Sequence, residues 1–421
     1  MDTMASSTPL TQANTTFTLA LFKKITEENK SGNVFYSPLS ISSALAMVLL
    51  GARGNTSTQM SEVLCFSEAE GPQQQALPAL AQMQMQQRAP TTFLPQFLLK
   101  RMKGEEDINA SFSKLLSELN KPDALYSLSL ANRLYGEKTY QFVQGFLDET
   151  RKYYQADLQS VDFKTKAEEA RVEINTWVEK QTQDKIKDLL VPGVVDSLTR
   201  LVLVNAIYFK GKWDEPFKEE ATEETAFKLN KNDTKKVKMM YRKATFPLAF
   251  IPEANCQILE LPYEGKELSM LICLPMEIED GTTGLEKLEA MLTYETFMEW
   301  TQPDRMGQRE VLVGLPRFKM TQTYDMKDLL VSMGMVDAFD QGLSDFSGMS
   351  SANDLVLSKV VHKAFVEVNE EGTKAAAATH SRQNLCFRIT PEFVADHPFL
   401  FFIRHNPSKS ILFAGRYSSP E

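Results

Sequence analysis

The feature that most constrains the fold of this chain is a run of small residues between a strand-like segment and a cluster of bulky apolar residues. Phe365-Val366-Glu367-Val368 has the alternation typical of a β-strand. Gly372 interrupts that pattern, and the stretch from Lys374 to Thr379 then contains four consecutive alanines. Because alanine has the highest helix propensity, the run by itself favours a short surface helix. The strand pattern directly before it argues against that helix.

The same segment also has the side-chain pattern of a strand. Alternate positions hold four small, uncharged residues: Thr373, Ala375, Ala377 and Thr379. The interleaved positions hold the charged or titratable side chains of Lys374 and His380. Such a segment can enter a sheet with its small face inward and its charged face toward solvent. The sequence therefore predicts two states for this loop, an exposed coil or helix and a buried strand.

Several motifs along the chain resemble those of the serpin family. They are Glu370-Glu371-Gly372-Thr373 followed by Ala375 to Ala378, the segment from Phe393 through Asp396-His397-Pro398-Phe399 to Phe401, Asn33 to Ile41, and Leu203 to Gly211. They occur in the family's order and extend over nearly the whole chain, so chance agreement does not explain them. Within the family, the chain is most similar to the intracellular, ovalbumin-type branch, known as clade B.

The resemblance implies an α+β serpin fold, with about nine helices around three β-sheets and an exposed reactive-centre loop. No Pro-, Gly- or Ser-rich linker divides the chain, so we expect one serpin domain over residues 1–421. By comparison with the family, residues 67–107 are a long inserted loop between the third and fourth helices. Residues 370–393 are the hinge and the reactive-centre loop.

The inserted loop is rich in glutamine and methionine, as in Gln82-Met83-Gln84-Met85. Loops of this length are usually functional or disordered. Two interpretations stay open: a tether, or a docking site or glutamine-rich cross-linking substrate. The short basic segment 100–103 is followed by acidic residues at 105–107, so we expect no nucleic-acid binding there.

The resemblance also implies a mechanism, inhibition of proteases by a loop that is cut. Counted in the family's register, Gly372 is the fifteenth residue before the cut, which places the reactive bond at Cys386–Phe387. The specificity residues are then Leu385 and Cys386, whose apolar side chains suit elastase-like and chymotrypsin-like serine proteases. A cut beside Leu385 or Phe387 is the alternative register. The partner would be the target protease, in a covalent 1:1 complex with a monomeric inhibitor.

The resemblance assigns further residues to the hinge and to two places in the main sheet. The hinge residues are Glu370, Glu371, Gly372, Thr373, Ala375, Ala376, Ala377 and Ala378. The shutter and breach residues are Ser37, Ser40, Asn205, Trp213, His362 and Arg317. We expect His362 to pair with Asn205 beneath the sheet, and Arg317 to pair with Glu370 at its end.

Two other functions compete with serine-protease inhibition. The first is a non-inhibitory serpin that acts as a binding or storage protein on the same fold. Non-inhibitors tend to carry bulky or charged residues at the inward hinge positions, where this chain has Thr373, Ala375 and Ala377. The second is cross-class inhibition of papain-like cysteine proteases, which the sequence leaves open.

Composition and the lack of catalytic motifs argue against nucleic-acid binding, membrane binding and enzymatic activity. A net charge of −9 and a pI of about 5.3 argue against general binding to nucleic acid or anionic membranes. No G-x-S-x-G, H-E-x-x-H, P-loop or G-x-G-x-x-G motif is present, so we predict that the chain is not an enzyme and needs no cofactor or metal. The four cysteines lack CxxC spacing and residues 1–7 lack the features of a secretory signal. We therefore expect reduced thiols and a cytoplasmic location, with extracellular release without a signal peptide left open.

The pattern of apolar residues predicts several elements. We expect helices over 10–28, 38–50 and 166–187. Ser37 and Pro38 suit the start of the second helix, which should be buried, and Thr56 and Gln59 resemble a capping box. Leu201 to Phe209 is apolar on both faces, which predicts a central strand covered on both sides. Cys256–Leu261 and Leu268–Leu274 should form a hairpin.

Overall fold

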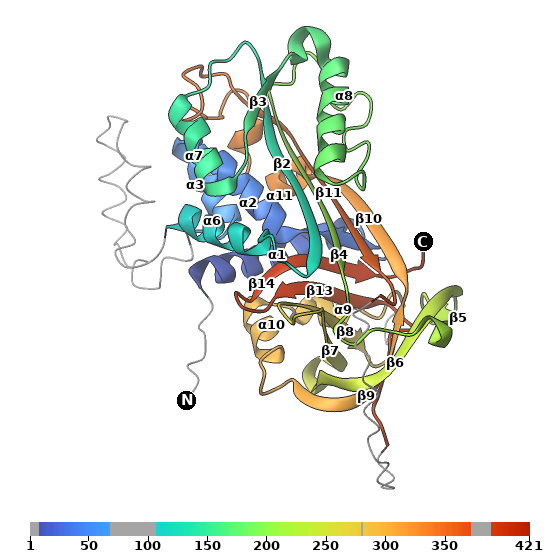
Figure 1. The fold of residues 1–421 in the computed structure, drawn as a ribbon. Coiled ribbons are helices and arrows are strands. Elements are labelled where there is room, and N and C mark those ends of the chain that lie inside the picture. Colours follow the sequence, from blue (N-terminus) through green and yellow to red (C-terminus); the bar gives the residue numbers. More distant parts are fainter. Residues whose placement is uncertain (1–7, 68–106, 279–280, 372–388) are drawn as a thin grey trace, which may run out of the picture.

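A five-stranded sheet forms the upper half of the molecule in Figure 1. The computed structural model describes residues 8–67, 107–278, 281–371 and 389–421. The sheet's strand order is β10 (Phe318–Asp325), β11 (Leu357–Val368), β4 (Leu201–Gly211), β2 (Tyr126–Glu137) and β3 (Leu158–Val161). The central strand β4 is buried along nearly all its length, as its uniformly apolar sequence predicts.

The side chains of β4 alternate between two hydrophobic cores. Leu201, Leu203 and Phe209 belong to the larger core, which includes the helices behind the sheet. Val202 and Val204 belong to a smaller core between the sheet and α8. This sheet is therefore covered on both faces, and Figure 1 shows α8 over one of them.

The remaining strands form a nine-stranded network. Its main path is β1 (Val34–Tyr36), β14 (Ser410–Tyr417), β13 (Phe399–His405), β8 (Leu268–Pro275), β7 (Cys256–Pro262), β6 (Thr234–Ile251), β9 (Gly307–Pro316) and β12 (Glu392–Val394), and β5 (Glu223–Lys228) pairs with β6. The 18-residue β6 pairs with β9 over Met239–Leu248 and with β7 over Leu248–Ile251. It thereby joins two smaller sheets, which with the five-stranded sheet make the three that were expected. The predicted hairpin is the antiparallel pair of β7 and β8.

The described part of the chain contains nine α-helices. They are α1 (Pro9–Glu28), α2 (Pro38–Leu49), α3 (Gly54–Val63), α6 (Ile108–Leu119), α7 (Gln144–Tyr154), α8 (Phe163–Gln181), α9 (Glu286–Met291), α10 (Tyr294–Trp300) and α11 (Met326–Met333). Short 3-10 turns lie at Glu219–Ala221, Pro252–Ala254 and Asp337–Phe339. Every residue of α2 is buried, and Ser37 caps its N-terminus ahead of Pro38, as predicted.

Two local predictions were wrong. The helix α3 begins at Gly54, so Thr56 and Gln59 lie inside it and form no capping box. Their side chains instead accept hydrogen bonds from distant backbone amides, Thr56 from Asp345 and Gln59 from Val336.

The helix predicted over 166–187 was too long at its C-terminal end. It begins after the N-cap Asp162, has a kink at Lys166, where the expected helix starts, and ends at Gln181. Gln183 and Asp184 follow with φ of 53° and 61°, in the left-handed region that stops a right-handed helix.

Candidate functional site

The candidate site is the strand pair that leads into the small-residue segment. β11 and β4 run parallel and are in continuous register from Lys359 opposite Val202 to Val366 opposite Phe209. A register shift separates this stretch from the first pair, Leu357 opposite Leu201. Their outer neighbours, β10 and β2, are antiparallel to them. A segment that follows β11 and turns back would run antiparallel to both β11 and β4. If β11 and β4 separate, the residues that follow β11 could therefore enter between them and pair antiparallel with both strands.

A buried polar cluster lies at the middle of this pair. His362 of β11 is opposite Asn205 of β4, and His362 Nδ1 is 2.6 Å from Asn205 Oδ1. The backbone N–H of Ser37 donates to His362 Nε2 at 3.0 Å. Because an amide N–H can only donate, Nε2 must accept, and the ring proton is on Nδ1, where it donates to Asn205. Burial lowers the pKa of His362 to about 3, so the ring is neutral at physiological pH.

The same cluster extends to the helix behind the sheet and to the nine-stranded network. Ser40 Oγ donates to Asn205 Oδ1 at 2.8 Å, and Asn205 Nδ2 donates to the Ser40 carbonyl at 3.4 Å. Ser37 Oγ donates to the carbonyl of Leu412 in β14 at 2.6 Å. The four side chains of Ser37, Ser40, Asn205 and His362 are all buried. One polar cluster thus connects β11, β4, α2 and β14.

Trp213 holds the end of the pair, where the chain leaves β11. Its indole Nε1–H donates to the Asn369 carbonyl at 2.8 Å, and its backbone N–H donates to the Glu371 carbonyl at 3.0 Å. The indole ring stacks on Tyr263, with 4.5 Å between ring centroids. A Cβ at Gly211 would lie 2.4 Å from the Tyr263 ring, so this arrangement requires glycine at the end of β4.

Glu370 and Glu371 are bound to neighbouring strands through their side chains. The Glu370 side chain is only 7% exposed, and its Oε1 accepts from Thr222 Oγ1 at 2.8 Å and from Arg317 Nη1 at 3.4 Å. The Glu371 carboxylate lies 2.7 Å from Lys210 Nζ, and this hydrogen bond lowers the pKa of Glu371. The first residues after β11 are therefore fixed by backbone and side-chain contacts.

The structure places the expected sheet residues in two groups. Ser37, Ser40, Asn205 and His362 form the cluster at the middle of the strand pair, and Trp213, Arg317, Glu370 and Glu371 surround its end. The expected contacts between His362 and Asn205 and between Arg317 and Glu370 are present, but their roles in function stay predictions. The remaining hinge residues and the reactive bond lie outside the described residues: Gly372, Thr373, Ala375, Ala376, Ala377, Ala378, Leu385, Cys386 and Phe387.

Sequence reasoning missed three partners in these groups. Thr222 and Lys210 bind the two glutamates, and the Leu412 carbonyl binds Ser37. Lys210 belongs to the Leu203–Gly211 motif and could have been found there. The carbonyl of Leu412 is backbone, so no residue type could have indicated it.

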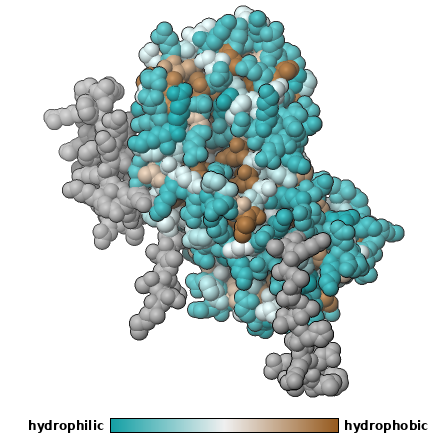
Figure 2. Space-filling model, viewed as in Figure 1, coloured by the Kyte–Doolittle hydropathy of each residue, from teal (hydrophilic) through white to brown (hydrophobic). Residues whose placement is uncertain are grey.

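Among the described residues, no group of three or more His, Cys, Asp or Glu side chains is arranged to hold a metal ion. No described helix combines the length and the apolar character that crossing a membrane requires. The face shown in Figure 2 is mostly hydrophilic, with hydrophobic residues along its middle.

Comparison with known proteins agrees with this geometry. The chain is 52% identical over 412 residues to leukocyte elastase inhibitor of Equus caballus, covering 98% of this chain and 99% of that protein. It is 50% identical over the same length and coverage to leukocyte elastase inhibitor of Homo sapiens and to serpin B6 of Macaca fascicularis.

Solved structures and a family model lead to the same assignment. Uncleaved ovalbumin superposes with a TM-score of 0.82 at 36% identity, over 98% of this chain and 100% of ovalbumin. Maspin superposes with a TM-score of 0.84 at 35% identity, over 98% of each chain. The model of the serpin (serine protease inhibitor) family matches residues 12–420. With the α+β architecture described above, these matches show that the chain belongs to the serpin family, in its ovalbumin-type branch.

Proposed function

We propose that this serpin inhibits elastase-like and chymotrypsin-like serine proteases as a suicide substrate. The protease serine attacks the carbonyl of Cys386, the amine of Phe387 leaves, and an acyl bond joins the protease to Cys386. The freed residues 373–386 then enter the sheet between β11 and β4, and the protease stays bound in a covalent 1:1 complex. The inhibitor acts as a monomer without a cofactor, in the cytoplasm or after release without a signal peptide.

The observation that carries this proposal is the parallel pairing of β11 with β4. A returning strand is antiparallel to both only at this pair, and the residues that directly follow β11 begin the small-residue segment. The alternation of Thr373, Ala375 and Ala377 would then face the core, where small uncharged side chains cost least to bury.

The length of the loop supports the same mechanism. Residues Thr373 to Cys386 number fourteen and would extend about 46 Å as a strand. The 12 residues of β11 extend about 40 Å. An inserted loop would therefore run along the whole of β11 and carry a bound protease from one end of the sheet toward the other.

Insertion would release enough free energy to make the uncut state a kinetic trap. A new internal strand gains ~0.5–1.5 kcal/mol per net hydrogen bond, or on the order of 10 kcal/mol over the loop. This free energy is comparable to the whole stability of a typical domain, about 5–15 kcal/mol. The uncut, five-stranded state would then persist because opening the β11–β4 pair is slow.

The class of protease follows from the residues before the cut. Leu385 and Cys386 have apolar side chains of small to medium size, which suit the pockets of elastase-like and chymotrypsin-like enzymes. The name of the relatives at 50–52% identity, leukocyte elastase inhibitor, supports the same class.

A trapping experiment tests the proposal. Purified protein is mixed separately with neutrophil elastase, chymotrypsin and cathepsin G, and an SDS-resistant band at the summed mass is expected with at least one of them. Mass spectrometry should place the acyl bond at Cys386, whereas cleavage only after Arg382 or Arg388 would overturn both register and specificity. Cleavage without a covalent band would support the non-inhibitory alternative, and a band formed only with a papain-like enzyme would support cross-class inhibition.

A further inference from the structure

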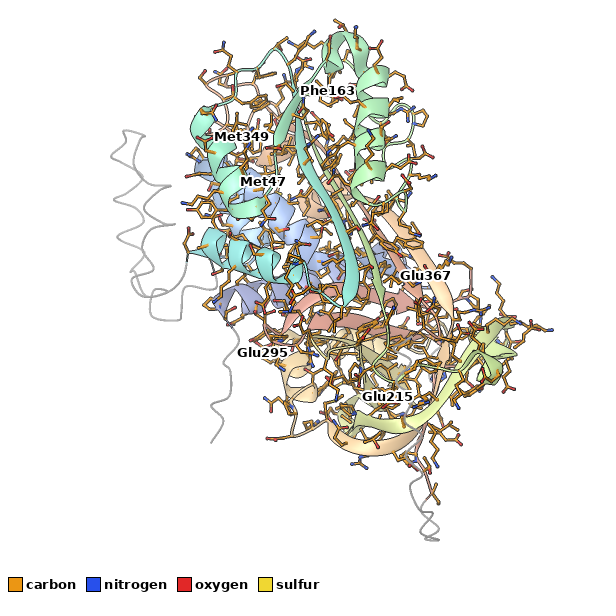
Figure 3. All side chains as sticks on the ribbon, viewed as in Figure 1. Met47, Phe163, Glu215, Glu295, Met349 and Glu367 are labelled. Atoms are coloured by element: carbon orange, nitrogen blue, oxygen red, sulfur yellow. The ribbon has the colours of Figure 1, made fainter. Side chains whose placement is uncertain are left out.

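Two aromatic rings meet across the β11–β4 pair, on the face of the sheet that α8 covers. Tyr208 of β4 lies directly opposite Phe365 of β11, and their rings are stacked, with 5.3 Å between centroids and 21° between planes. Tyr208 is 4% exposed and belongs to the core beneath α8, against which Phe365 packs. Figure 3 labels Glu367, which lies two residues after Phe365 on the same face of β11.

This aromatic stack lies between the polar cluster and the end of the pair where the chain leaves β11. Phe365 comes three residues after His362 and three residues before Val368, the last residue of the strand. A loop that follows β11 and enters from this end would therefore reach the stack before it reaches His362 and Asn205. The stack and the polar cluster lie on opposite faces of the sheet, because side chains alternate along each strand.

No other opposed pair in β11 and β4, which the structure describes in full, joins two aromatic rings. The remaining opposed pairs on the α8 face are Lys359 with Val202, Val361 with Val204, and Lys363 with Ala206. An aromatic pair contributes enough beyond its buried area to change a rate by about 2- to 10-fold. The stack is therefore the contact on this face that most distinguishes the closed pair from an open one.

The segment that follows α8 covers the stack. Its Lys185 ammonium lies 5.5 Å from the centroid of the Tyr208 ring, and Ile186 is 1% exposed in the same core. Lys363 of β11 donates from Nζ to the Lys187 carbonyl at 2.9 Å. The segment thus contacts both strands beside the stack and limits the access of water to it.

On the basis of the proposed function, we infer that Tyr208 and Phe365 hold this end of the β11–β4 pair closed and thereby set the rate at which the loop enters. Neighbouring strands lie about 4.8 Å apart, so a strand between β11 and β4 would move them to about 9–10 Å and separate the two rings. The stack must therefore break before the loop can enter. Tyr208 and Phe365 are accordingly positioning residues for insertion and for the capture of the protease.

Hydrogen exchange of the intact protein tests the stack without a protease. Mass spectrometry follows the amides of residues 201–209 and 357–368 in wild type, Tyr208→Leu, Phe365→Leu and the double variant. Each single variant should exchange about 2- to 10-fold faster in these segments, because leucine keeps an apolar side chain but removes the stacked ring. The double variant should exchange no faster than the single variants, since the first substitution already breaks the contact.

A matched control separates this effect from a general loss of aromatic packing. Phe297→Leu breaks the edge-to-face pair between Phe297 of α10 and Phe402 of β13. It should leave exchange in the two segments unchanged, although it also removes one ring of a buried pair. Thermal melts establish that every variant is folded.

The same variants are then mixed with a protease that the wild type traps. The ratio of covalent complex to cleaved free inhibitor should rise by the same factor, because faster insertion succeeds more often against deacylation. Unchanged exchange in both single variants, additive effects in the double variant, or faster exchange without a higher ratio would overturn the inference. If the wild type traps no protease, the proposed function fails, whereas the exchange rates still show whether the stack holds the two strands together.

Discussion

Replacing His362 by glutamine should weaken the pH dependence of stability between pH 7.5 and pH 5. Burial lowers the pKa of His362 to about 3, whereas the unfolded chain restores a pKa near ~6.5. Below that pH the unfolded chain takes up a proton that the folded chain refuses. The stability present above pH ~6.5 is therefore lost progressively as the pH falls toward the folded pKa.

The size of the effect follows from the pKa shift. At pH 5, which is about 1.5 units below the unfolded pKa, the loss is about 2 kcal/mol at ~1.36 kcal/mol per unit. Unfolding entropy of ~2.1 cal/mol/K per residue gives about 0.9 kcal/mol/K for 421 residues. The histidine should therefore contribute a decrease of about 2 °C in the melting temperature.

The assay compares melting curves of wild type and His362→Gln at both pH values and constant ionic strength. Glutamine can accept from the Ser37 amide and donate to Asn205, so it preserves the hydrogen-bonding roles without a titratable group. All other groups titrate in both proteins, and only the difference in pH dependence is interpreted. If the variant loses as much melting temperature as wild type on acidification, His362 is not the buried neutral group described here.

Three further predictions test the hinge and the pair of Glu370 with Arg317. Glu370→Lys removes the acceptor for both Thr222 and Arg317, which should lower the stability by about 1–3 kcal/mol and promote polymers that size-exclusion chromatography detects. The control Glu310→Lys, in an exposed ion pair, should stay monomeric. Cleavage within 380–386 by a non-target protease should raise the melting temperature sharply, and an unchanged value would indicate a non-inhibitory serpin. Thr373→Arg must bury an unpaired charge on insertion, so it should be cut and release active protease, because each ~1.4 kcal/mol slows insertion tenfold. Ala376→Arg, on the opposite face, should still trap protease, and equal trapping by both arginine variants would refute loop insertion.

Local signals in the sequence predicted the elements that rest on local physics. Ser37 before Pro38 indicated the start of α2, because a hydroxyl cap and a proline both suit the first turn. The apolar run of β4 indicated a strand with two covered faces, and the two cores on either side of it confirm that prediction.

The capping-box prediction failed because distant parts of the chain supply the partners of its two side chains. Thr56 and Gln59 have the spacing of a capping box, but Asp345 and Val336 supply the amides that their side chains bind. Those amides are about 280 positions away in the sequence, so no local pattern could reveal them. In the candidate site, too, some groups could be predicted from the sequence and others could not. The family motifs indicated His362 and Asn205, whereas the backbone carbonyl of Leu412 became visible only in the fold.

The polar cluster of Ser37, Ser40, Asn205 and His362 affects how readily β11 and β4 can separate. Of its hydrogen bonds, the one between His362 and Asn205 joins β11 to β4, whereas Ser37 and Ser40 bind these two residues from α2. Separating the strands would therefore break one side-chain bond and leave the His362 Nδ1–H unpaired, whereas Asn205 Oδ1 keeps the Ser40 hydroxyl as its donor. The unpaired donor would cost about 1–3 kcal/mol until an incoming strand supplies an acceptor, so in the proposed insertion this cost acts on the barrier and not on the final state. A cluster that slows opening by about 10- to 100-fold without opposing the inserted state is what the proposed trapping mechanism requires.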